Sequence, residues 1–259
     1  DAWVSEQVAK SSVTLHAIWG DGDTLVAAGT SGTITMKTGG ANWKGQASND
    51  PSSSDIYDIA GSKLDGLVLV GAGGSIILRD GDKWNIQNVT GPNMLASDLV
   101  AAAPINGSWF AIGATGGGLT LTEEGNWVDA STQPDADVHG MTGTADGKVW
   151  MVGDKGLIIV ETSTGWTRFE SGTTRDLYAA ASSAEGDVWV AGSGGVVLHI
   201  DSEGTVSKVP TGVPVSLFGI AVSGDEVAVC GKGGTLMRLD ADASKFTPVS
   251  SGTPNELRS

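Results

Sequence analysis

The sequence is poor in cysteine, in positive charge and in long apolar runs. Its single Cys, Cys230, excludes an internal disulfide framework. Lys and Arg number 15 against 30 Asp and Glu, and the net charge of −15 argues against binding a nucleic-acid backbone or an anionic membrane surface. No apolar run approaches the ~20 residues of a membrane-spanning helix, since residues 99–105 form about the longest one. We therefore expect no nucleic-acid partner and no membrane insertion.

Glycine and tryptophan, in contrast, are abundant. The chain of 259 residues has 39 Gly, roughly twice the usual share. Its 9 Trp outnumber the 4 Phe and 2 Tyr together. The hydrophobic fraction of 40% is enough for a substantial core, which argues against disorder. Because the Gly residues show no G-X-Y period, a collagen-like structure is excluded.

The Trp residues mark an internal repeat with a period of about 40 residues. The marked positions are Trp3, Trp43, Trp84, Trp127 and Trp166, and the series continues at Val206 and Phe246. Each unit contains short runs rich in Val, Ile and Leu, whose length suits strands rather than helices, separated by turn-forming residues. Glycine pairs with the spacing G-x-x-G, such as Gly192 and Gly195, predict tight hairpins that need positive φ.

Four short strands in each of six repeats predict an all-β fold, a β-propeller of six four-stranded blades forming one domain over 1–259. The repeat units are expected at 11–50, 51–91, 92–131, 132–170, 171–210 and 211–250, with 1–10 and 251–259 as terminal closure segments. Seven blades are the alternative, because residues 255–257 are similar to the start of another first strand.

The amino-acid sequence of the repeats resembles that of known propeller families. Residues 176–180 and 187–199 resemble the secreted propeller repeats common in myxobacteria and related bacteria. They are also similar to the photosystem II assembly-factor propellers and to the neuraminidase-like (BNR) repeats, whose Asp-box is here reduced to forms such as residues 124–127. The resemblance covers essentially the whole chain. It implies a propeller in which the first strand of each blade is innermost and lines a central channel.

The known catalytic sets of such folds are missing from the sequence. A sialidase needs three Arg on one face and a Tyr nucleophile, whereas the five Arg are scattered across the units and Tyr57 and Tyr178 occupy equivalent repeat positions. There is no G-x-S-x-G elbow, H-E-x-x-H helix or P-loop. We therefore expect that the protein is not an enzyme.

Cysteine and histidine also fit packing positions better than chemical ones. Cys230 aligns with apolar residues of the other repeats, which predicts a small buried hydrophobe. His16 and His139 share a repeat position with Tyr57, Val100, Tyr178 and Phe218. A position that accepts such different side chains indicates bulk rather than a metal ligand.

Carboxylates precede the first strand of most units. The residues at this position are Thr14, Asp55, Asp98, Asp137, Asp176 and Ser216. By the resemblance they would surround one mouth of the channel, where the four Asp could hold a hydrated cation or attract a basic group. The alternative is that each Asp accepts hydrogen bonds from nearby backbone N–H groups. We take the four Asp as candidate binding residues and expect no cofactor beyond such a cation.

Two long linkers, 45–54 and 87–97, break the repeat and are places where a propeller could acquire specificity. The second contains Met94 and Leu95, which are apolar residues in an expected surface loop. They indicate a contact with a partner protein, with packing on their own blade as the alternative.

A complete repeat fold without a catalytic set predicts a noncatalytic interaction scaffold or an accessory subunit of a larger extracytoplasmic assembly, with a protein partner. One alternative is a lectin-like propeller whose Trp residues stack on sugars. Another is an enzyme that uses channel-mouth carboxylates such as Asp98 and Asp137. Because the chain begins with Asp1 and resembles secreted propellers, we expect a processed protein of the periplasm or the cell exterior.

Overall fold

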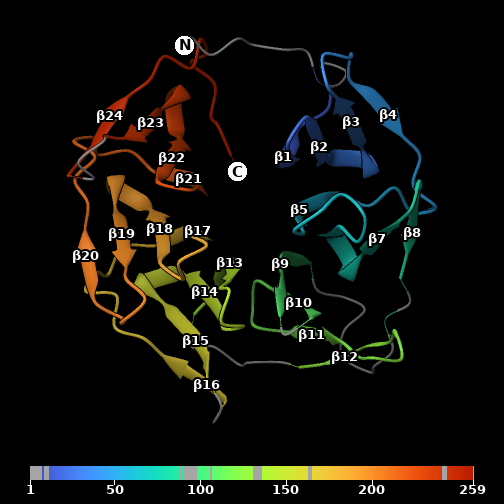
Figure 1. The fold of residues 1–259 in the computed structure, drawn as a ribbon, viewed down its shortest axis with the longest axis horizontal. Helices are drawn as coiled ribbons and strands as arrows, with labels where there is room; N and C mark the ends of the chain where they lie inside the picture. Colours follow the sequence, from blue (N-terminus) through green and yellow to red (C-terminus); the bar gives the residue numbers. More distant parts are fainter. Residues whose placement is uncertain are drawn as a thin grey trace. The chain divides into compact units, whose positions relative to one another are not determined.

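The computed structural model describes residues 8, 12–87, 89, 98–105, 107–130, 136–162, 165–240 and 244–258. In these ranges the regular elements are strands and single 3₁₀ turns. The strands form six four-stranded sheets in which each strand pairs antiparallel with the next one in the sequence (Figure 1). The fold is thus a β-propeller with six blades, as the repeat predicts. Residues 255–257 form no strand, so the alternative of a seventh blade is wrong.

The blades fall into two compact units of three. The N-terminal unit contains β1 (Leu15–Asp21), β2 (Thr24–Gly29), β3 (Ile34–Thr38), β4 (Lys44–Gln46), β5 (Ile56–Ala60), β6 (Val68–Gly71), β7 (Ile76–Asp80), β8 (Lys83–Ile86), β9 (Leu99–Ile105), β10 (Ser108–Gly113), β11 (Gly118–Leu121) and β12 (Trp127–Asp129). The C-terminal unit contains β13 (Val138–Gly143), β14 (Val149–Gly153), β15 (Ile158–Thr162), β16 (Gly165–Arg168), β17 (Leu177–Ser182), β18 (Val188–Gly192), β19 (Val197–Ile200), β20 (Val206–Lys208), β21 (Leu217–Ser223), β22 (Glu226–Gly231), β23 (Leu236–Leu239) and β24 (Phe246–Pro248).

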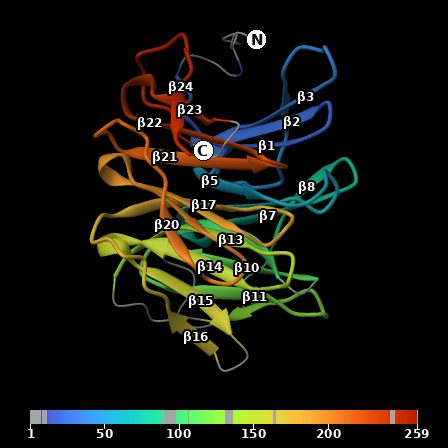
Figure 2. The ribbon, with the colours of Figure 1, turned by 60° about the vertical axis from the view of Figure 1, so that its left-hand side comes forward.

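The hydrophobic core of each unit lies between its blades. Strand β5 packs against β1 and β9, and β17 packs against β13 and β21, so the first strands of a unit lie side by side (Figure 2). Trp84 packs in a core cluster that contains residues of the first blade. Trp127 packs in another cluster that contains residues of the second blade. Each of these two side chains is 1% exposed. Trp84 and Trp127 are therefore packing positions between blades, whereas Trp43 is only partly buried.

A 3₁₀ turn joins the second and third strands in five of the six blades. These turns are η1 (Thr30–Gly32), η2 (Ala72–Gly74), η3 (Asp154–Gly156), η4 (Ser193–Gly195) and η5 (Lys232–Gly234). The last two residues of a turn have positive φ, for example 66° at Gly194 and 77° at Gly195, which confirms the prediction from the spacing.

The first glycine of each G-x-x-G pair has a different role from the one that the hairpin interpretation assigns. Gly153 is extended, with φ −168°. A Cβ atom added there would lie 1.9 Å from the carbonyl oxygen of Asp137. Glycine is needed at this position because the linker into the first strand crosses it closely, and not because of positive φ.

A β-bulge recurs near the start of every first strand. The pairing register with the second strand shifts by one residue there, as between Leu177 and Ala179 in β17. The extra residues are His16, Tyr57, Val100, His139, Tyr178 and Phe218. Rings on neighbouring bulges of one unit meet, with centroids 5.5 Å apart for His139 and Tyr178 and 5.3 Å apart for Tyr178 and Phe218. The shared position thus selects bulk for packing along the bulges, as the repeat comparison predicts.

Candidate functional site

Three of the four candidate carboxylates bind the turn of the preceding blade. The bonds join Asp55 Oδ1 to the N–H of Ser31 (2.7 Å), Asp98 Oδ1 to the N–H of Gly73 (2.9 Å) and Asp176 Oδ1 to the N–H of Lys155 (3.0 Å). The donor is in each case the middle residue of a 3₁₀ turn, where φ is positive. Each Asp thus accepts a backbone N–H, but the donor belongs to the turn of the preceding blade and not to the local turn at the start of its own strand, as the alternative assumes.

Asp137 occupies the same place in its blade. Its carbonyl oxygen accepts the N–H of Asp154 at 2.9 Å, as the Asp176 carbonyl does for Ser193 at 2.8 Å.

In the N-terminal unit, burial together with the negative charges of Asp98 and Asp55 raises the pKa of Tyr57. Among the described residues, no group of three or more His, Cys, Asp and Glu side chains is arranged to hold a metal ion. Cation binding by these Asp residues stays a prediction.

Of the two long linkers, the structure describes 45–54 in full and only residues 87 and 89 of 87–97. Met94 and Leu95 lie outside the described residues. In the other linker, the carboxylate of Asp50 accepts the N–H groups of Ser52 (2.9 Å) and Ser54 (3.2 Å) and is 7% exposed. Asp50 therefore folds this linker onto itself.

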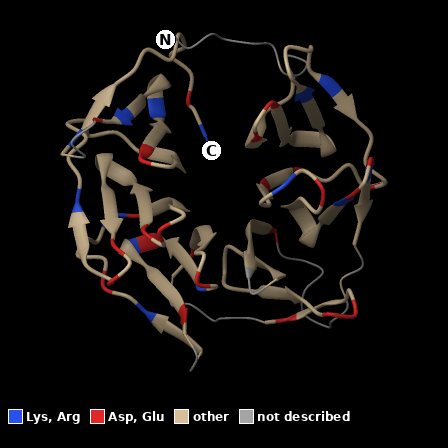
Figure 3. Ribbon diagram, in the orientation of Figure 1, with Lys and Arg blue, Asp and Glu red and all other residues tan. Residues whose placement is uncertain are grey.

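A pocket of about 510 Å³ lies in the C-terminal unit, beside the linker from β16 to β17. It is lined by residues 168–175, by Lys155 and Gly156 of η3, and by Lys208 at the end of β20. Four lining residues are cationic, Lys155, Arg168, Arg175 and Lys208, whereas Glu170 is the one acidic residue among them. Figure 3 shows the basic residues of β16 and β20. The pocket therefore reverses the charge balance of a chain whose net charge is −15.

The wall of the pocket is held by close backbone contacts. A Cβ atom on Gly156 would lie 2.0 Å from the carbonyl oxygen of Thr173, so the linker passes directly over η3. The N–H of Arg175 donates to Thr173 Oγ1 at 3.1 Å. On the apolar side, Phe169 packs its ring on Trp150 at a centroid distance of 5.0 Å and joins the same core cluster as Val206. Phe169 thus adds an aromatic ring where Val206 replaces the Trp of the repeat.

Sequence reasoning missed this pocket because the five Arg were expected to be scattered across the units. The structure brings Arg168 and Arg175 to one cavity. One feature of the sequence does indicate the pocket cations. Two residues after the Trp position, the repeats have Gly45, Ile86, Asp129, Arg168, Lys208 and Pro248. Only two consecutive blades carry a cation there.

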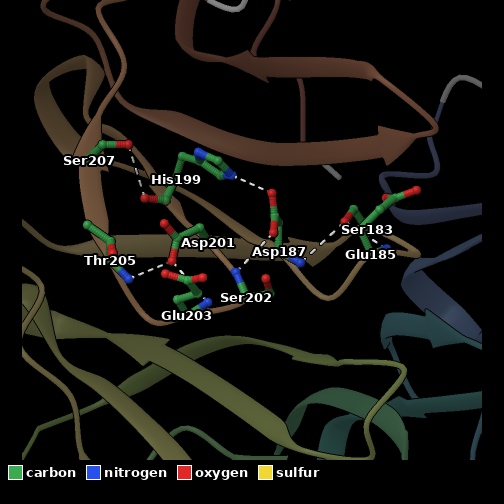
Figure 4. A network of polar contacts seen from close by, with 9 residues as sticks. All are labelled: Ser183, Glu185, Asp187, His199, Asp201, Ser202, Glu203, Thr205 and Ser207. Carbon is green, nitrogen blue, oxygen red and sulfur yellow. Dashed lines mark hydrogen bonds and ion pairs between the residues drawn. The ribbon is translucent and has the colours of Figure 1, made fainter.

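A polar network at the opposite end of the strands ties two turns of one blade together (Figure 4). Asp187 Oδ2 lies 2.7 Å from His199 Nε2, and Asp187 Oδ1 accepts the N–H of Ser202 at 3.0 Å. The ring of Trp189 stacks on His199 with centroids 4.3 Å apart. These contacts give His199 a role in holding the blade, because both of its neighbours belong to turns or strands of that blade.

Cys230 is a free cysteine that is partly buried, and not fully buried as its repeat position predicts. Burial raises the pKa of its thiol to about 11, so the reactive thiolate is scarce. In the part of the chain that the structure describes, no helix is long and apolar enough to span a membrane.

No family model matches the sequence, and no curated protein does. Several solved structures match over most of this chain. YCF48 from Cyanidioschyzon merolae is 15% identical with a TM-score of 0.72, and the match covers 94% of this chain and 87% of that one. A structure of YCF48 bound to D1 peptide is 18% identical (TM-score 0.70, covering 90% and 80%). The WD40 propeller domain of Doa1 is 12% identical (TM-score 0.77, covering 94% and 84%). These likenesses show the fold of the chain, a β-propeller.

Proposed function

We propose that this protein is a noncatalytic protein-binding propeller that serves as a scaffold or accessory subunit of a larger assembly. The observation that supports it most is the open pocket at the β16–β17 linker, which is lined by four exposed cationic residues that the packing of the blades does not require. Binding sites in repeat folds are placed on such linkers, because the strands must conserve their packing.

The bulges add a second feature suited to a protein partner. The half-exposed rings of His139, Tyr178 and Phe218 lie along the linker ends of the first strands in the same unit as the pocket. Aromatic rings of this kind are common in protein interfaces. The fold can hold a peptide, since a YCF48 propeller is solved with one.

The other candidate functions receive less support from the described residues. Trp84 and Trp127, which a lectin would use to stack on sugars, are buried between blades. The carboxylates of Asp55, Asp98 and Asp176 bind backbone N–H groups. A protein-binding function needs no cofactor, and a location in the periplasm or outside the cell agrees with the likeness of the repeats to secreted propellers.

The test is to isolate the protein from its natural source at native abundance, through a small affinity tag and after mild crosslinking. We expect one partner protein to accompany it in a fixed ratio, as measured by mass spectrometry and by the mass of the complex in solution. Tagging that partner should in turn retrieve this chain. Recovery of a lone monomer after crosslinking would refute the proposed function, and binding on a glycan array would favour the lectin.

A further inference from the structure

We propose that the pocket formed by Lys155, Arg168, Arg175 and Lys208 binds an acidic peptide segment of the partner protein, with the carboxylates of that segment against these cations. The proposal rests on the protein-binding function above and specifies the chemistry of the partner. It concerns one cavity in the C-terminal unit and requires nothing of the other blades.

The repeat itself shows that the fold does not need these cations. The middle residue of the 3₁₀ turn is Lys155 in one blade and Ser31, Gly73, Gly194 or Gly233 in the others. The residue before the first-strand Asp position is Arg175 in one blade and Val13, Ser54, Ser97, Ala136 or Val215 elsewhere. All blades form the same sheet, so the cations are additions to the fold and gather at one place.

Lys155 is placed in a conformation that its residue type avoids. Its φ is +56°, a region that costs a non-glycine residue about 1–2 kcal/mol in comparison with glycine. Three of the other four turns have Gly there. Its backbone N–H is fixed by the carboxylate of Asp176. A strained residue that brings a charge to a cavity indicates a site of function.

Three of the pocket cations, Lys155, Arg175 and Lys208, differ from the arginines outside the pocket in their ion-pair partners. Outside the pocket, Arg79 Nη2 lies 3.8 Å from Asp82 Oδ1. The side chain of Arg238 pairs with Glu226, and that of Arg258 pairs with Glu256. Within the described ranges, no ion pair involves the side chain of Lys155, Arg175 or Lys208. Their charges are thus available to a ligand.

The backbone around the pocket belongs to regular elements, while the side chains of its four cationic residues are exposed. The guanidinium of Arg175 lies against the turn at Gly194, where an added Cβ would be 3.3 Å from Arg175 Cζ. Lys155 is held in η3 and Lys208 ends β20. Arginine and lysine held in this way recognise carboxylates through charge-assisted hydrogen bonds.

The surroundings favour a short acidic peptide over a phosphate or a long polyanion. A volume of about 510 Å³ exceeds what a single small anion needs. Glu170 in the lining opposes every anionic ligand, and the net charge of −15 opposes a long polyanion more than a short peptide, because the few carboxylates of a short peptide can all lie near the four cations. Phe169 also lines the pocket, and its ring packs on Trp150 of the core.

The test uses a fluorescein-labelled hexapeptide of alternating Leu and Glu, its counterpart with Gln in place of Glu, and inorganic phosphate. Binding to the full chain is followed by fluorescence anisotropy at low and moderate salt. We expect the Glu peptide to bind at least tenfold more tightly than the Gln peptide and to weaken with salt. The variants Arg175→Gln and Lys208→Gln should each weaken binding about tenfold, as expected for one charge-assisted hydrogen bond.

Lys44→Gln is the matched control, because Lys44 is an exposed lysine on the fourth strand of a blade outside the pocket. It should bind the peptide as the parent chain does, and thermal melting should show that all variants are folded. Equal binding of the Gln peptide, or undiminished binding by both pocket variants, would overturn the proposal. Displacement of the peptide by phosphate beyond the effect of equal ionic strength would assign the pocket to phosphate instead.

Binding of the natural partner distinguishes the proposed acidic-peptide site from the broader proposal of a protein-binding function. If the partner isolated from the source binds Arg175→Gln/Lys208→Gln as well as it binds the parent chain, the pocket is not its site and the protein-binding function stands. If no partner is found, the protein-binding function itself fails.

Discussion

The two units build the same blades but hold their linkers differently. In the C-terminal unit, a hydroxyl residue followed by Gly recurs at 171–172, 211–212 and 251–252. There Thr211 Oγ1 donates to the carbonyl of Gly195 at 2.8 Å, and Ser251 Oγ donates to that of Gly234 at 2.6 Å. In the N-terminal unit, the described linker between β4 and β5 is longer and is folded by the carboxylate of Asp50.

The difference shows that packing between blades fixes the strands and leaves the linkers free to vary. Short linkers in close contact with the turns make a rigid frame, and the cationic pocket occurs in the unit that has them. We infer that the C-terminal unit is the more specialised half for binding. Three predictions test this comparison, in order of decreasing effect on stability.

The largest effect is expected for Gly195→Ala in the C-terminal unit. The new Cβ would lie 1.7 Å from the carbonyl oxygen of Val213, so the linker must move, and we expect a loss of about 3–5 kcal/mol in the free energy of unfolding. Urea denaturation measures it.

Two further Ala variants serve as comparisons for Gly195→Ala. At Gly212, φ is also positive but the space is open, so Gly212→Ala should cost only about 1–2 kcal/mol. Gly32→Ala, at the equivalent turn position of the N-terminal unit, should fall between them, because its Cβ would lie 3.1 Å from Ser53 Cα. Equal losses at Gly195 and Gly212 would contradict the close-linker account.

The fold could be predicted from the sequence because each blade repeats the same strand lengths and turn residues. The period of the Trp positions and the G-x-x-G spacing both reflect local requirements that recur in every blade. The bulges were visible only as a position that accepts His, Tyr, Val and Phe, since a register shift leaves no mark on a strand of that length. The role of the first glycine was missed because it depends on a linker that crosses from another part of the sequence.

The pocket could be predicted only in part, because Arg168 and Lys208 share one repeat position whereas Lys155 and Arg175 come from other elements. Lys155, Arg175 and Lys208 are separated by 20 residues or more, and nothing in their local sequences links them. The carboxylate of Asp58 was likewise overlooked, since it stands in a run that was interpreted as an apolar first strand. It accepts the N–H of Ala102, at 2.8 Å, from the neighbouring blade. Both features depend on contacts between blades, which the pattern of a single repeat does not contain.

A second prediction concerns Asp58, which has Gly or Ala at the equivalent positions of the C-terminal unit, such as Gly140 and Ala179. Burial raises the pKa of Asp58 to about 6, from 3.8. Between these values the folded chain keeps a proton that the unfolded chain has released. The contribution of protonated Asp58 to the free energy of unfolding is therefore present at low pH and is lost as pH rises from about 4 to 6.

Asp58→Asn should remove this dependence. The difference in unfolding free energy between variant and parent should shift in favour of the variant by about 2 kcal/mol between pH 4 and 7. Urea denaturation at a series of pH values measures it. A difference that stays constant over this range would show that the carboxylate is not destabilised by burial, and the N-terminal unit would lose its distinguishing pH response.

The smallest effect tests a contact that the two units share. Asp98 and Asp176 each accept one N–H from the turn of the preceding blade. Asp98→Ala and Asp176→Ala should therefore cost about the same, roughly 0.5–1 kcal/mol, because each removes one exposed hydrogen bond whose N–H donor can then bind water. The Asn variants keep an acceptor oxygen and should lose less. If instead the carboxylates hold a cation, 5 mM CaCl₂ should raise the melting temperature of the parent chain and leave the Ala variants unchanged. Equal losses without a calcium response would mean that these Asp residues serve the fold alike in both units, so that the units differ in function only through their linkers.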